Sequence, residues 1–76
     1  MFFWIEDSQK DFVIVAKANS PREAAQVAMD HASESGARVY SPIRVHVMKE
    51  PEGEVGTVLP MQRYDEFKFT RKYELP

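Results

Sequence analysis

The chain has 76 residues, a formal net charge of −2 and no cysteine. A chain of this length forms one small domain, residues 1–76, which buries only about 60% of the surface that its unfolded form exposes. The lack of cysteine excludes disulfide bonds and thiolate zinc sites, and the apolar run at residues 2–5 is too short for a secretion signal or a membrane span.

The first predicted elements are two strands. Residues 2–5, Phe-Phe-Trp-Ile, are four consecutive large apolar residues, a pattern typical of a central strand that is buried on both faces. A polar loop over residues 6–11 follows. Residues 12–18 are rich in β-branched side chains and predict a second strand.

A helix is expected over residues 21–35. Ser20 is suited to cap its first turn, Pro21 fits the first helical position, and Glu23 completes a capping box. Gly36 supplies the residue that ends the helix.

The apolar stripe of this helix consists mostly of alanine. Such a stripe lets the helix backbone lie close to a sheet, so the bulky side chains of the interface must come from the strands. The stripe is centred on Ala28 and flanked by Ala24, Ala25 and Ala32, with Val27 and Met29 at its edges.

Three further strands are predicted in the second half. Residues 39–49 alternate in polarity, with Pro42 marking a bend, bulge or edge near the start. A type I turn at residues 50–53 leads to a short strand at residues 55–59. The alternation of aromatic and polar residues within 64–73 indicates a fifth strand, and a helix is the alternative there.

These elements predict an α+β fold, ββαβββ, in which one helix packs on one face of a mostly antiparallel sheet of four to five strands. The strand–helix–strand crossover makes the second and third strands parallel. The first strand then lies between them, antiparallel to both, and the expected strand order is 2-1-3-4.

One helix covers only one face of such a sheet. Phe2 and Trp4 point opposite to Phe3 and Ile5, so two large apolar side chains face away from the helix. Either the C-terminal segment folds over that face, or the aromatic side chains form a surface for a partner or a second copy. We expect the first arrangement, with these aromatic residues as the cover: Tyr64, Phe67, Phe69 and Tyr73.

No catalytic set can be assembled from the sequence. None of the five serines lies in a recognisable nucleophile motif, and the three glycines all have turn or bulge explanations. His31 and Glu34 share one helix face, but a metal site needs such a motif more than once, and His46 is the only other histidine. We expect no enzyme activity, no cofactor and no metal.

The candidate binding residues lie in the second half of the chain. Basic side chains interleaved with an aromatic one on a sheet could contact a protein partner or follow a nucleic-acid backbone. Acidic neighbours such as Asp65, Glu66 and Glu74 equally fit an ordinary solvated face. The candidate residues are Arg44, His46, Arg63, Tyr64, Lys68, Arg71 and Lys72.

The junction of the second strand and the helix carries a resemblance. Ala18-Asn19-Ser20-Pro21, followed by Glu23-Ala24-Ala25 and Val27-Ala28, resembles a group of short type I anti-CRISPR proteins over residues 12–48. The same region is similar to the core of HicB-like antitoxins, but the glycine-rich turn and the Pro-Gly-Cys-like segment of that family are missing. The first resemblance implies a stoichiometric inhibitor that binds a CRISPR surveillance complex, and no binding residue is carried over from it.

The sequence therefore predicts a small, soluble, cytoplasmic binding protein, and the resemblance implies that it is encoded by a phage and directed at a CRISPR effector complex of the host. Two alternatives remain open. One is a nucleic-acid-binding module that uses the basic side chains of the sheet, and the other is a structural subunit that associates with itself. No membrane partner is expected.

Overall fold

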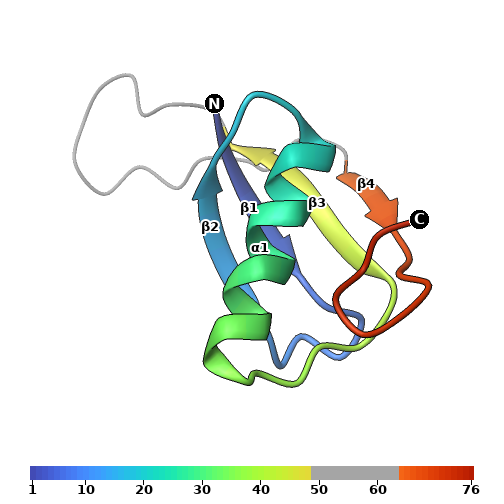
Figure 1. Cartoon of the computed structure of the whole chain (residues 1–76). Coiled ribbons are helices and arrows are strands. Elements are labelled where there is room, and N and C mark those ends of the chain that lie inside the picture. Colours follow the sequence, from blue (N-terminus) through green and yellow to red (C-terminus); the bar gives the residue numbers. More distant parts are fainter. Residues whose placement is uncertain (49–63) are drawn as a thin grey trace.

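The computed structural model describes residues 1–48 and 64–76. Within them, one helix packs on a four-stranded sheet, which confirms the predicted α+β class (Figure 1). The predicted turn at 50–53, the predicted strand at 55–59 and Arg63 lie outside the described residues. The elements in chain order are β1 (Phe2–Glu6), β2 (Val13–Lys17), α1 (Pro21–Ser35), β3 (Ile43–Met48) and β4 (Tyr64–Phe67).

The strand order of the sheet is β2-β1-β3-β4. β1 is antiparallel to both β2 and β3, so the predicted central position of the opening Phe-Phe-Trp-Ile segment is confirmed. The place beside β3 that the sequence assigned to residues 55–59 is taken by β4 in the described sheet. The C-terminal strand is confirmed over the alternative helix, but it ends at Phe67 instead of reaching Tyr73.

β3 begins at Ile43, four residues later than the sequence predicted. The segment before it bonds to the β1–β2 loop instead of to the sheet. The backbone N–H of Tyr40 donates to Asp7 Oδ2 at 3.1 Å, and the carbonyl of Tyr40 accepts from the N–H of Ser8 at 3.2 Å.

The predicted bounds of α1 are confirmed, and so is its N-cap. Ser20 Oγ accepts from the N–H of Glu23 at 3.1 Å, and Gly36 ends the helix in the left-handed conformation. The capping box differs in one bond: Glu23 Oε2 accepts from the N–H of Asn19, one residue before the cap, at 3.4 Å.

The alanine stripe of α1 lies directly on the sheet. Ala24, Ala25, Ala28 and Ala32 are completely buried, and so is Met29, whereas Val27 is exposed and does not form the expected edge of the stripe. The bulk of the core comes from the strands, as predicted, through the fully buried large side chains of Phe3, Ile5, Ile43 and Val45.

Asp7 is the one buried charged residue among those described. Its Oδ1 accepts from the backbone N–H groups of Asp11 and Phe12 at 2.9 and 3.2 Å, and its Oδ2 accepts from that of Tyr40. These bonds replace the water that the carboxyl group loses on burial. Asp7 therefore joins the β1–β2 loop to the segment that leads from the helix into β3.

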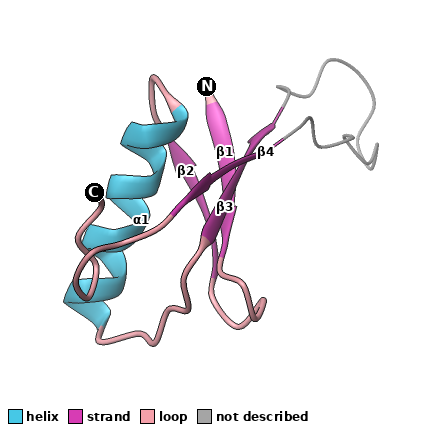
Figure 2. Cartoon of the chain, turned by 90° about the vertical axis from the view of Figure 1, so that its right-hand side faces the viewer, coloured by secondary structure: helices cyan, strands magenta, loops and turns pink. Residues whose placement is uncertain are grey.

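The C-terminal segment, residues 68–76, does not cover the far face of the sheet, which corrects the expected arrangement; of the four expected covering residues only Tyr64, on β4, lies on that face. The segment lies on the same side as α1 (Figure 2), where Tyr73 donates a hydrogen bond from Oη to the carbonyl of Ala37, and Arg22 bonds to the carbonyl of Pro76. This position lets the segment bury apolar surface, because four side chains of the segment and of β4 pack against the helix-side core. They are Phe67, Phe69, Tyr73 and Leu75.

Replacing Ala28 with leucine tests the close packing of helix and sheet. The methyl group of Ala28 is fully buried between helix and sheet, and added bulk in a packed core is destabilising, so we expect Ala28→Leu to lower the free energy of unfolding by about 1–3 kcal/mol in urea titration. Ser33→Leu adds the same bulk on the exposed side of α1 and should change stability by less than about 0.5 kcal/mol. Equal effects of the two substitutions would contradict the packing described.

Asp7→Ala tests the buried carboxyl group. The substitution leaves three backbone N–H donors without their acceptor, and we expect a loss of about 2–3 kcal/mol in the free energy of unfolding. Asp11→Ala is the matched control, because Asp11 is exposed and only its backbone takes part in the network. Thermal unfolding of both variants, followed by circular dichroism, shows whether the loss of stability is specific to the carboxyl group of Asp7.

Candidate functional site

The face of the sheet that points away from α1 is the candidate site, and we call it the open face. Strand register places alternate residues of every strand on it. In the part of the chain that the structure describes, both α1 and the C-terminal segment lie on the other side (Figure 2). The open face consists of Phe2, Trp4, Glu6, Val13, Val15, Lys17, Arg44, His46, Met48, Tyr64 and Glu66.

The register arranges these side chains in rows that cross the sheet. The middle row, which we call the ring row, runs from Val15 on β2 through Trp4 and His46 to Tyr64 on β4, because each of these residues is the partner of the next. The His46 and Tyr64 rings lie 5.2 Å apart at an interplanar angle of 54°. Tilted contacts of this kind are favourable between aromatic side chains.

The next row is charged and alternates in sign. It crosses from Val13 through Glu6 and Arg44 to Glu66. The Nε of Arg44 lies 3.5 Å from Glu66 Oε1, and its guanidinium carbon is 5.5 Å from the centroid of the Tyr64 ring. Arg44 thus connects the charged row with the ring row.

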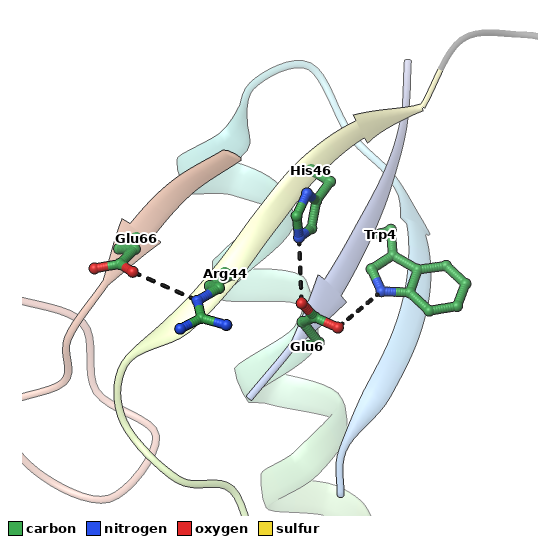
Figure 3. Close-up of polar contacts among 5 residues, drawn as sticks. All are labelled: Trp4, Glu6, Arg44, His46 and Glu66. Carbon is green, nitrogen blue, oxygen red and sulfur yellow. Dashed lines mark hydrogen bonds and ion pairs between the residues drawn. The ribbon is translucent and has the colours of Figure 1, made fainter. Parts of the chain in front are cut away.

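Glu6 connects the two rows at the centre of the sheet (Figure 3). Its Oε2 accepts from the indole Nε1 of Trp4 at 3.4 Å, and its Oε1 lies 3.3 Å from Nε2 of His46. The side chains of Glu6 and His46 are only 14% and 12% exposed. The two hydrogen bonds therefore fix the rings of neighbouring strands relative to each other, and little of the charge reaches solvent.

The open face exposes several apolar side chains beside its charged ones. Val13 and Val15 are 45% and 48% exposed, Tyr64 is 48% exposed, and Phe2 is 37% exposed. This corrects the expectation that residues 2–5 are buried on both faces: only Phe3 and Ile5, on the helix side, are fully buried. A surface of rings and aliphatic groups fits the binding of another macromolecule.

The structure brings together only part of the predicted binding set. Arg44, His46 and Tyr64 are neighbours on the open face. Lys68 follows the end of β4 and belongs to no strand, and Arg71 and Lys72 lie in the C-terminal segment. There Arg71 Nε is 3.8 Å from Glu74 Oε2, and Lys72 Nζ is 5.0 Å from the centroid of the Tyr73 ring. The predicted basic sheet face is thus divided between two regions.

Sequence reasoning missed Glu6, which it assigned to the loop. The signal was the alternation of residues: Phe2, Trp4 and Glu6 have the same parity, so an extension of the first strand by one residue places Glu6 beside Trp4 on the open face. The contact of Glu6 with His46, 40 positions later in the chain, follows only from the register of β1 and β3.

Within residues 1–48 and 64–76, no three side chains of His, Cys, Asp or Glu gather as a metal site requires. The same part of the chain contains no helix with the length and apolar character that would let it cross a membrane.

Comparison with known proteins finds no matching family model, no matching curated protein and no matching solved structure.

Glu6→Ala tests the central connection of the open face. The protein has a single tryptophan, so its fluorescence reports on Trp4 alone. Without the carboxyl group the indole N–H loses its acceptor, and we expect a shifted emission maximum and a lower steady-state anisotropy. Glu66→Ala removes a carboxyl group of the same face that makes no bond to Trp4 and should leave both signals unchanged. An unaltered Trp4 signal in Glu6→Ala would contradict the fixed arrangement of the rings.

Proposed function

We propose that this chain is a small non-enzymatic binding protein that acts by occupying a surface of another protein, with the open face as its recognition surface. The observation that carries the proposal is the ring row, which crosses the whole described sheet on the side opposite α1. Large apolar side chains are costly to leave in water, and a partner that covers them gains the free energy of their burial.

The composition of the open face supports a protein partner. Tryptophan, tyrosine, arginine and methionine are enriched at protein interfaces, and the first three carry much of the binding energy. Trp4, Tyr64, Arg44 and Met48 all lie on this face. Because Glu6 fixes Trp4 and His46 in advance, little side-chain freedom is lost there when a partner binds.

The charges of the open face favour protein over nucleic acid. Lys17 and Arg44 are balanced by Glu6 and Glu66, and Arg44 is already paired with Glu66. Binding to a phosphate backbone needs an excess of positive charge. Single-stranded nucleic acid remains the second candidate partner of the open face, because aromatic rings on a sheet can also stack with bases.

The partner class we propose is a CRISPR surveillance complex, in the cytoplasm of a bacterium infected by a phage that encodes the chain. The resemblance of residues 12–48 to short type I anti-CRISPR proteins supports this choice. Such an inhibitor needs no catalytic group, only a surface that outcompetes the natural ligands of the complex, and the open face has the chemistry for such contact.

The test uses two substitutions at opposite margins of the open face, Val15→Glu on β2 and Tyr64→Glu on β4. Each places a charge in the ring row at a side chain that is 48% exposed, so folding is preserved. We expect both to weaken binding to purified type I CRISPR complexes in calorimetry by at least about tenfold, and to abolish phage protection in an immune host.

Val27→Glu is the matched control, because it makes the same change at an exposed valine on α1, on the other side of the sheet. It should bind like the unmodified protein. Equal loss in all three variants, or no binding by the unmodified protein, would contradict the proposal. Retardation of single-stranded RNA or DNA that falls steeply with salt and disappears in Tyr64→Glu would favour the second candidate.

A further inference from the structure

The outer edge of β2 has backbone groups that no strand of the described sheet uses. β2 is the terminal strand of the order β2-β1-β3-β4, and it forms the margin of the sheet in Figure 1. Its core contains three β-branched residues and no proline, and a lysine at its end is its only charge. Sheet edges usually carry some device that prevents pairing with another chain. In β2 that device is limited to Lys17.

The hydrogen bonds that flank β1 and β2 show which groups point outward. The N–H of Ala18 donates to the carbonyl of Met1, and that of Asp7 donates to the carbonyl of Phe12, both at 3.0 Å. In an antiparallel pair the hydrogen-bonded positions recur at every second residue. With the observed register, the even-numbered residues of β2 bond to β1. The N–H and carbonyl groups of Val13, Val15 and Lys17 therefore point away from the sheet.

The charges at the two ends of β2 make this edge complementary to itself. Asp11 lies two residues before the strand begins, and Lys17 is its last residue. When two copies of the strand pair antiparallel with Ile14 opposite Ile14 of the second copy, Lys17 of each chain faces Asp11 of the other. The same register places Val13 opposite Val15, so two β-branched pairs form on the open face.

The same register provides hydrogen-bond partners for the backbone of the edge and buries additional apolar surface. Val13 and Val15 both have outward-pointing groups, so they can exchange N–H to carbonyl bonds across the edge. Ile14 is only half-buried at the margin of the core, and its contact with the second Ile14 removes further apolar surface from water. The Val13–Val15 contact occurs twice around a two-fold axis that passes between the two Ile14 side chains, which gives a closed dimer instead of a fibre.

We propose that two copies of this chain pair through β2 and form one continuous antiparallel sheet. The two-fold axis is perpendicular to the sheet, so both open faces lie on the same side, and the two ring rows form parts of one larger surface. The occupant of this edge is a second copy. Val15 belongs to this interface as well as to the open face, so Tyr64→Glu, on β4 at the other end of the sheet, is the variant that tests the open face without altering the β2 edge.

Sedimentation equilibrium of the full chain over a dilution series tests the proposal, with twice the mass of one chain as the expected result. Hydrogen exchange gives the matching residue-level signal: the amides of Val13, Val15 and Lys17 should be protected at high concentration and lose protection on dilution. A mass of one chain throughout the series, or fast exchange of these three amides in the dimer, would overturn the proposal.

Charge exchange tests the register. Asp11→Lys puts a lysine opposite Lys17 at both ends of the interface, and Lys17→Asp does the same with two acids. Each single substitution should weaken the dimer by about tenfold, because symmetry places two such pairs in the interface. The double variant Asp11→Lys/Lys17→Asp restores opposite charges and should recover the original affinity. A double variant as weak as the single ones would overturn this pairing.

Val15→Pro tests the edge hydrogen bonds. Proline removes an N–H that points away from β1, so the β1–β2 ladder keeps its bonds while the edge loses a donor. We expect a folded single chain by circular dichroism and sedimentation. Val15→Thr keeps the N–H and a β-branched side chain and should remain a dimer. Pairing that is unaffected by Val15→Pro would overturn the proposed use of this edge.

Discussion

A single helix with an alanine stripe packs on a four-stranded sheet, and this constraint determines which side chains form the core and which remain exposed. The methyl groups of α1 fit against Phe3 and Ile5 on one side of β1. The C-terminal segment adds its aromatic side chains to the same core. Because both coverings gather on one side, the alternation of β1 leaves Phe2 and Trp4 on the other. The recognition surface that we propose is thus a direct result of how the core is built.

The open face combines apolar exposure with internal order. Exposed rings on a small domain are a liability when they are mobile, because they associate without specificity. Here Glu6 holds the indole of Trp4 and the imidazole of His46 at the centre of the sheet, and Arg44 lies between Glu66 and the Tyr64 ring. A partner therefore meets a surface whose shape is set before contact, and such preorganisation favours selective binding.

The sequence predicted what depends on local chemistry. Ser20, Pro21 and Gly36 mark the helix correctly, and the crossover rule places β1 between β2 and β3. Prediction from the sequence failed where either side of the sheet could accept the same segment. Aromatic periodicity in residues 64–73 does not reveal which side of the sheet they pack on, and the predicted side was wrong for Phe67, Phe69 and Tyr73. Asp7 and Glu6 were both assigned to a polar loop, since their partners Tyr40 and His46 lie more than 30 positions away.

Asp7 also has a consequence for how the molecule opens. Its carboxyl group binds amides from the β1–β2 loop and from the segment after the helix. Neither segment can detach alone without leaving this buried group partly unsatisfied. The two loops at this end of the sheet therefore behave as one cooperative unit in local unfolding, although α1 separates them in the chain. When temperature or denaturant concentration rises, the two loops unfold together, and the side chain of Asp7 alone determines that they belong to one unit.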